Sequence, residues 1–123
     1  MTENNMQRLT LPWPPAVLNP NQARKHHWSV RSKAAKAYRA ECMLRAKGAL
    51  LQVPAEGKIR IQLEFCPPDL RERDDDNLIG AFKPGRDGVA DALGIDDKRF
   101  AMREPLRGAK RPGGAVVMLI EGA

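Results

Sequence analysis

The chain has 123 residues, of which 42% are hydrophobic and 5% aromatic, and its 21 Lys and Arg against 15 Asp and Glu give a net charge of +6. This length suits one domain with a modest aliphatic core, and a small core favours a homodimer that hides further apolar surface. No apolar run reaches the roughly 18 residues that span a bilayer, and the first residues lack the apolar stretch of a signal peptide. We therefore expect a cytoplasmic protein with no membrane partner.

Residue patterns in the N-terminal half predict a strand, an irregular segment, a helix and a second strand. Residues 9–11 alternate as a strand does and lead into a stiff, proline-rich segment. Residues 16–29 lack periodicity and include a basic, aromatic run. Strong helix formers follow from about 32 to 51, and strict alternation over 58–65 predicts the clearest strand of the chain. The apolar arc of the predicted helix consists of Ala35, Tyr38, Cys42, Ala46 and Ala49.

The C-terminal half predicts one more helix and two more strands. Helical residues run from about 77 to 93, with a kink or division at Pro84-Gly85 and a C-cap at Gly94. Strands are expected over 99–104 and 115–120, joined by a flexible, basic hairpin loop. The order β-α-β-α-β-β predicts one small α/β domain over residues 1–123, of the α+β kind, with helices packed on a mixed sheet.

The charges are distributed unevenly along the chain. Residues 1–65 carry 11 basic and 4 acidic side chains, whereas all eight aspartates fall between Asp69 and Asp97. An excess of positive charge favours a polyanionic partner. A concentrated acidic patch suits such a partner when a divalent cation lies between the carboxylates and a phosphate. The other explanation, that the aspartates serve as helix caps and turn residues, stays open.

Two short segments carry the candidate chemistry: Asp74-Asp75-Asp76 and Asp96-Asp97. Residues two apart in an extended stretch point the same way, so Asp74 and Asp76 are expected to share a face. Asp76 or Asn77 is expected to cap the following helix. A straight helix of roughly 15 residues is about 23 Å long. Asp97 therefore meets Asp76 only through the break at Pro84-Gly85 or a fold-back after Gly94.

Other kinds of site do not fit the spacing. An EF-hand loop starting at Asp74 would need Gly where Ile79 stands and Glu where Gly85 stands. The chain has no P-loop and no nucleophile motif. The adjacent histidines and the two distant cysteines make no zinc pattern. Because the cysteines form no CxxC pair, we expect two reduced thiols.

The order of these motifs resembles the RusA family of Holliday-junction resolvases of bacteria and their phages. The segments that carry the resemblance are 11–15 (LPWPP), 37–39 (AYR), the strand over 58–65, Arg73-Asp74-x-Asp76-Asn77-Leu78, 91–93 (DAL) and Asp96-Asp97. Together they cover nearly the whole chain. The resemblance implies a Mg²⁺-dependent endonuclease that acts on four-way DNA junctions as a homodimer. It also implies that Asp74, Asp76 and Asp97 bind the metal.

The chain departs from the family pattern at its catalytic lysine. That lysine stands four residues after the second signature aspartate, where this chain has Gly80. The nearest lysine is Lys83, one helical turn further on, and we expect it to offset negative charge in the transition state.

We expect the DNA surface to be basic and to recognise backbone phosphates. The candidate residues are Arg24, Lys25, Lys33, Lys36, Arg73, Lys110 and Arg111. Two alternatives to a junction resolvase are open: a non-catalytic DNA-binding protein left in a prophage, and a flap or fork nuclease with the same metal site.

Overall fold

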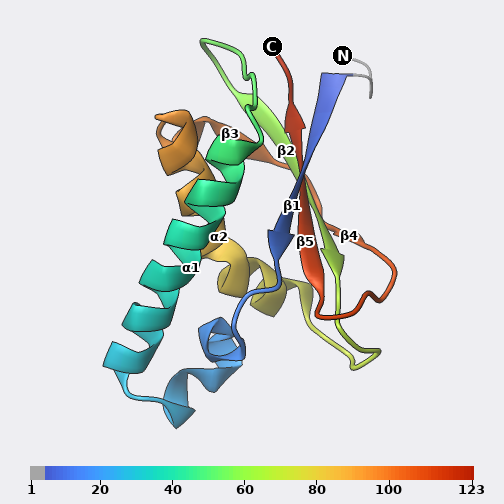
Figure 1. Cartoon of the computed structure of the whole chain (residues 1–123). Helices are drawn as coiled ribbons and strands as arrows, with labels where there is room; N and C mark the ends of the chain where they lie inside the picture. The colour runs from blue at the N-terminus through green and yellow to red at the C-terminus, as the bar shows by residue number, and fades with distance from the viewer. Residues whose placement is uncertain (1–4) are drawn as a thin grey trace.

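The computed structural model describes residues 5–123, in which strands and helices alternate (Figure 1). The elements are β1 (Met6–Pro12), the 3-10 helices η2 (Ala16–Leu18) and η3 (Pro20–Lys25), α1 (Trp28–Gly48), β2 (Ile59–Cys66), α2 (Asp75–Leu93), the 3-10 helix η4 (Asp97–Arg99), β3 (Phe100–Met102), β4 (Leu106–Arg107) and β5 (Ala115–Glu121). The predicted α+β class, with helices packed on a mixed sheet, is confirmed. The short strand β4 is an addition to the predicted order.

The sheet is built around β5, which lies between β1 and β2 and runs antiparallel to both. The other edge of β2 pairs in parallel with β3 and then with β4. The predicted hairpin before β5 is therefore wrong, because β4 and β5 lie on opposite sides of β2. The connecting segment instead passes the end of β2, where the N–H of Gly108 donates to the Phe65 carbonyl (2.9 Å) and that of Arg111 to the Pro67 carbonyl (3.0 Å).

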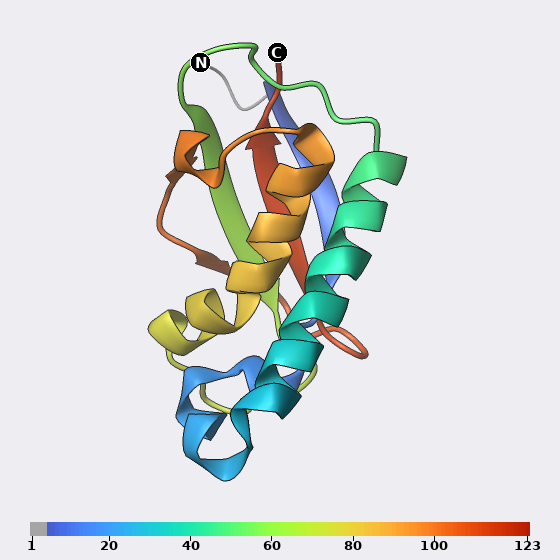
Figure 2. The ribbon, with the colours of Figure 1, turned by 90° about the vertical axis from the view of Figure 1, so that its left-hand side faces the viewer.

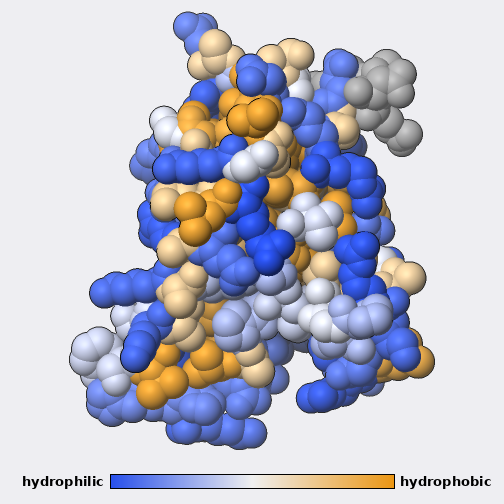
Figure 3. Space-filling view, viewed as in Figure 1, coloured by the Kyte–Doolittle hydropathy of each residue, from blue (hydrophilic) through white to orange (hydrophobic). Residues whose placement is uncertain are grey.

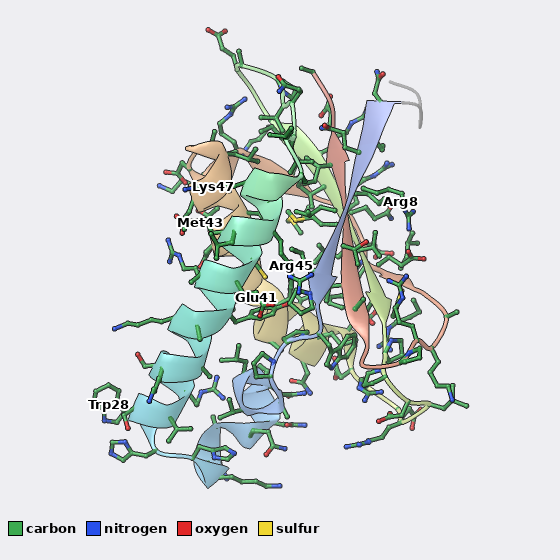
Figure 4. All side chains as sticks on the ribbon, viewed as in Figure 1. Arg8, Trp28, Glu41, Met43, Arg45 and Lys47 are labelled. Carbon is green, nitrogen blue, oxygen red and sulfur yellow. The ribbon has the colours of Figure 1, made fainter. Side chains whose placement is uncertain are left out.

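Both helices cover the same face of the sheet (Figure 2). The alternating residues of β2 confirm the predicted pattern, since Ile59, Ile61, Leu63 and Phe65 are buried. The predicted apolar arc of α1 is confirmed at its centre, where Tyr38, Cys42 and Ala46 are buried. On the opposite face β1 and β2 are polar, whereas the central strand β5 contributes Val117 and Leu119. Arg8 on β1 points away from the helices (Figure 4). The two layers thus enclose one core, in which the aliphatic side chains surround Tyr38, Phe65, Phe82 and Phe100.

Both cysteines are free and buried. Burial raises the pKa of the Cys42 thiol to about 11. Within residues 5–123, no helix combines the length and the apolar character needed to cross a membrane.

Helix α2 begins and ends at polar caps. The Asp74 side chain accepts a hydrogen bond from the N–H of Asp76, and Gly94 closes the helix in a left-handed conformation, with φ 67°. Pro84 lies inside the helix and does not divide it. The first, yellow turns of α2 run in a different direction from its orange remainder (Figure 2), as expected where a proline removes a backbone hydrogen bond.

Helices α1 and α2 approach each other closely at Gly88. A Cβ atom added to Gly88 would overlap the carbonyl oxygen of Arg39 in the backbone of α1. One turn earlier, a Cβ atom on Gly85 would lie 2.7 Å from the ring of Tyr38. The two glycines therefore let α2 lie directly against α1 and determine its path across the sheet.

We predict that Gly88→Ala lowers the free energy of unfolding by about 1–3 kcal/mol or more, because backbone must move to admit the methyl group. The matched control is Gly48→Ala at the end of α1, where nothing lies within 4 Å of the added Cβ. That change should be neutral or stabilise by up to about 1 kcal/mol. Urea unfolding measures both variants, and equal stability of the two would contradict the close packing at Gly88.

Candidate metal and DNA-binding site

The acidic segment lies at the start of α2. The helix begins at Asp75, two residues earlier than predicted, and its cap is Asp74 rather than Asp76 or Asn77. The extended backbone expected for the whole segment is therefore wrong after Asp74, because the cap already closes the first turn. Asp74 and Asp76 are still neighbours, since the Asp74 Oδ1 lies 2.8 Å from the Asp76 nitrogen.

Arg73 holds the loop before α2 from inside. Its guanidinium contacts the Asp69 carboxylate at 2.9 Å and donates to the Arg71 carbonyl at 3.0 Å. It also lies over the Trp13 ring, 5.5 Å from the centroid. The Arg73 side chain is only 14% exposed. The structure thus gives Arg73 a role within the loop, and its predicted DNA contact stays a prediction.

Arg107 of β4 holds the same segment from outside. Its Nε donates to the Asp75 Oδ1 at 2.7 Å, and its Nη2 donates to the Arg73 carbonyl. Both neighbours of Asp74 are therefore held by one side chain from a distant strand. No local sequence pattern predicts this pairing, because Arg107 and Asp75 are 32 residues apart.

The carboxylate of Asp76 is the exception among the aspartates. Within residues 5–123 it makes neither a hydrogen bond nor an ion pair, whereas every other aspartate makes at least one. The partners are Arg71 and Arg73 for Asp69, the Asp76 N–H for Asp74, Arg107 for Asp75, Lys83 for Asp87, Arg39 for Asp91, the Lys98 N–H for Asp96 and Arg86 for Asp97. The cap-and-turn explanation therefore accounts for Asp69, Asp74 and Asp96, but not for Asp76.

A hollow of about 540 Å³ lies beside this segment. Trp13 and Leu78 contribute apolar surface, while Arg73, Asp74 and Asn77 contribute polar groups. The Asp69 carboxylate also lines it, and the hydrogen bond from the Arg71 N–H, together with Arg73, holds the pKa of Asp69 below its usual range. Of the acidic segment, Asp74 lines this hollow, whereas Asp75 and Asp76 do not.

Asp97 lies at the other end of α2. It is the first residue of η4, and its Oδ2 is 3.2 Å from the Arg86 Nη2. A straight helix with the 19 residues of α2 is about 28 Å long. Figures 1 and 2 agree that the start of α2 and the orange segment after it lie toward opposite ends of the molecule. The chain folds back after Gly94 and brings Asp97 to Arg86, but neither this fold-back nor the Pro84 bend closes the predicted site within the described residues.

In the part of the chain that the structure describes, no three Asp, Glu, His or Cys side chains gather closely enough to hold a metal ion. Asp97 instead shares a smaller hollow of about 230 Å³ with Asp87, Asp91, Asp96 and Arg39. Arg39 donates two hydrogen bonds to Asp91, at 2.6 and 2.9 Å, which lower the pKa of Asp91. The backbone N–H of Lys98 lowers the pKa of Asp96.

Lys83 lies near the middle of α2. Its Nζ lies 3.4 Å from the Asp87 carboxylate, one turn further along α2, and the lysine side chain is 57% exposed. The predicted swing of Lys83 toward Asp74 and Asp76 is therefore not seen within the chain.

Comparison with known proteins gives two relatives. An uncharacterized protein of Xylella fastidiosa (strain Temecula1 / ATCC 700964) is 48% identical over 120 residues, which cover 95% of this chain and 77% of that protein. The crossover junction endodeoxyribonuclease rusA of Enterobacteria phage 82 is 35% identical over 77 residues, which cover 60% of this chain and 61% of the phage enzyme. No family model matches the chain. The chain is similar to a RusA resolvase.

Gly80 stands at the position where the resemblance predicts a lysine. A Cβ atom on Gly80 would lie 2.8 Å from the Cγ of Pro20 in η3. A longer side chain at this position would force η3 away from α2. The position where a lysine is predicted is thus covered by η3.

The remaining predicted DNA-binding residues are all exposed. Arg24 and Lys25 end η3, Lys33 and Lys36 lie on α1, and Lys110 and Arg111 lie in the segment before β5. None of these six side chains makes an ion pair within residues 5–123. Their charges are therefore available to a polyanion, and their contact with DNA stays a prediction.

We predict that the Arg39–Asp91 pair stabilises the folded protein at neutral pH but not at acidic pH. The pKa of Asp91 is lower in the folded protein than its unfolded value of about 3.9. The contribution is therefore present above about pH 4 and is lost as the pH falls through the folded pKa. Urea unfolding of wild type and Asp91→Asn should differ most near pH 7 and converge near pH 3.

Glu41→Gln is the control, because it removes an exposed pair with Arg45 on α1 alone. Its effect should be small at both pH values. A stability difference for Asp91→Asn that does not change with pH would contradict the assignment.

Proposed function

We propose that this protein is a Mg²⁺-dependent endonuclease that resolves four-way DNA junctions by paired nicks, acting as a homodimer in the cytoplasm. The observation that carries the proposal is the Asp76 carboxylate, which has no partner in the described residues and follows the Asp74 cap of α2 by two positions. The similarity to a phage crossover junction endodeoxyribonuclease supports the same reading.

The donor set at the start of α2 fits magnesium. Mg²⁺ is usually held by one or two carboxylates together with waters and substrate phosphates. Asp76 offers two free oxygens, and Asp74 offers the one that does not cap the helix. An ion bound there supplies a Lewis acid for the scissile phosphate and activates a water. Arg107 and Arg73 fix the backbone on both sides of Asp74, so that the carboxylates need little rearrangement.

Asp97 completes the proposed site from a second copy of the chain. Within one chain α2 holds Asp97 away from Asp74 and Asp76. A two-fold dimer that places η4 of one copy against the start of α2 of the other brings the three carboxylates together twice. Lys83, which contacts Asp87 near Asp97, would then arrive with it and offset negative charge in the transition state.

The dimer also matches the substrate. A four-way junction has approximate two-fold symmetry, so two related sites nick two opposed strands. Two chains carry a net charge of 2 × 6 = +12, which favours binding of a branched phosphate backbone. The proposed contacts are Arg24, Lys25, Lys33, Lys36, Lys110 and Arg111.

A non-catalytic DNA-binding protein is the second candidate. It is favoured by Gly80, because this residue stands where the resemblance predicts a catalytic lysine. Gly80 has no charged side chain and packs against Pro20. Labelled four-way junction, fork, flap and linear duplex, incubated with Mg²⁺ or with EDTA, separate the candidates. Symmetric nicks in the junction support the resolvase, nicks confined to forks or flaps support a nuclease of that kind, and binding without cleavage in any divalent metal supports the second candidate.

We predict that Asp74→Asn, Asp76→Asn and Asp97→Asn each lower the cleavage rate by at least roughly 100-fold. Each change keeps the shape of the side chain but removes a charged ligand. Junction binding without metal should be unchanged or tighter, because negative charge near the phosphates is lost. Asp75→Asn is the control, because its carboxylate pairs with Arg107, and cleavage should fall much less.

Thermal unfolding must accompany these assays, because Asp97→Asn also removes the partner of the half-buried Arg86. An Asp76→Asn protein that is folded and fully active would overturn the metal site.

We predict that mixing inactive subunits restores activity. If each site takes Asp76 from one copy and Asp97 from the other, a heterodimer of Asp76→Asn and Asp97→Asn chains has one doubly changed site and one intact site. Refolding the two variants together should therefore restore nicking of one strand per junction. A mixture of Asp74→Asn and Asp76→Asn is the control. It should stay inactive, because Asp74 and Asp76 of each site come from the same chain, so every site in the mixture lacks one of them. No recovery in the first mixture would show that the site is not shared.

A further inference from the structure

The start of α1 presents two aromatic rings to solvent. Trp28, the first residue of the helix, is 72% exposed, and its side chain projects away from the rest of the molecule (Figure 4). The ring of His27 lies 5.5 Å from that of Trp28, with an angle of 35° between the ring planes. His27 is the N-cap of α1, and its Nδ1 accepts the N–H of Ser29 at 3.2 Å. The pair is therefore anchored to the helix rather than free to move with a loop.

Nothing in the fold requires Trp28 at this position. The other tryptophan, Trp13, packs edge-on against Phe65 at 6.3 Å and lies beneath Arg73, so it belongs to the body of the protein. Trp28 is absent from the hydrophobic core and from both hollows described above. The exposed apolar surface of a tryptophan favours binding, because covering it with a ligand lowers the free energy. The face in view is otherwise largely hydrophilic, with small apolar areas (Figure 3).

The charges that flank His27 and Trp28 in the sequence indicate which kind of ligand covers the Trp28 ring. From residue 4 to residue 40 the chain has seven basic and no acidic side chains. Arg31 donates to the Val17 carbonyl and Arg39 pairs with Asp91, so both are used within the fold. Arg24 and Lys25 precede the pair, and Lys33 and Lys36 follow it on α1, all exposed and without an ion pair in the described residues.

The first turn of α1 also lacks an acidic residue, whereas α2 begins with Asp75 and Asp76. The positive end of the α1 dipole is therefore not compensated by the chain itself. An exposed aromatic surface in a stretch of chain whose only charges are positive is complementary to a nucleic-acid strand with unstacked bases.

We infer that Trp28 and His27 form a stacking platform for unpaired nucleobases, with Arg24, Lys25, Lys33 and Lys36 around it contacting the adjacent phosphates. This inference rests on the proposed function for its substrate, since bases near the crossing point of a four-way junction lose stacking neighbours that bases inside a duplex arm keep. The platform gives the protein a way to prefer branched over linear DNA, which phosphate contacts alone do not provide.

The test is binding in EDTA, so that no cleavage and no metal are involved. Fluorescence anisotropy measures the affinity of wild type and Trp28→Ala for a labelled oligothymidine, a four-way junction and a linear duplex. A base–aromatic stack is lost on alanine substitution, so affinity for the first two should fall roughly 5- to 100-fold. Affinity for the duplex should change less than about 2-fold. Trp28→Phe keeps a ring and should retain most of the binding.

Leu44→Ala is the matched control, because Leu44 lies on the same helix and is 66% exposed. It should bind all three DNAs as wild type does. Equal affinities of wild type and Trp28→Ala for the oligothymidine and the junction overturn the platform. So does light scattering that finds Trp28→Ala monomeric where wild type is a dimer, since a second copy then covers the ring.

Intrinsic fluorescence gives an independent measurement. The chain has two tryptophans, so any quenching by oligothymidine that is present in wild type and absent in Trp28→Ala comes from Trp28. Unquenched wild-type emission at saturating oligonucleotide overturns the inference. Its failure is distinct from failure of the proposed function: a platform without cleavage in any metal refutes the nuclease alone, and cleavage with unaltered Trp28→Ala binding refutes the platform alone.

Discussion

The contact of α1 with α2 at Gly88 is the constraint on which the placement of the acidic residues depends. Because Gly88 leaves no room even for a methyl group against the Arg39 carbonyl, the path of α2 across the sheet is set there. The direction of α2 in turn separates the aspartates into two groups. Asp74 and Asp76 lie at its start, and Asp97 lies beyond its end. Within the described residues of one chain, the three carboxylates are therefore not brought together.

The two groups of aspartates are held by different means. At the start of α2, Arg73 and Arg107 bind the backbone and the side chains around Asp74 and leave the Asp76 carboxylate free. At the other end, Arg39 and Arg86 neutralise Asp91 and Asp97 directly. Arg86 is poorly satisfied, since its buried Nε has no partner in the described residues. An unpaired buried donor of this kind is unusual in folded proteins.

Opposite charges occupy different elements, and this separation links the site to the DNA surface. Arg24, Lys25, Lys33 and Lys36 lie on η3 and α1 and make no ion pair with the aspartates on and after α2 in the described residues, whereas Arg39 of α1 pairs with Asp91. A phosphate backbone can therefore bind to the basic region while a single phosphate approaches the carboxylates through a cation. The 3-10 helix η3 has two roles here. It carries Arg24 and Lys25, and its Pro20 packs against Gly80, where the resemblance predicts a lysine.

The sequence by itself determined the α+β class, the buried face of β2, the centre of the α1 arc and the cap at Gly94, because each depends on a local period or on one backbone conformation. It also picked out the residues that carry the proposed chemistry. Only the tertiary structure decided that the segment before β5 is no hairpin, that Arg107 holds Asp75, and that α2 keeps Asp97 from Asp76. These features depend on which strand pairs with which edge and on how closely two helices approach. Contacts between residues 11 to 32 positions apart leave no periodic signal in the sequence from which they could be predicted.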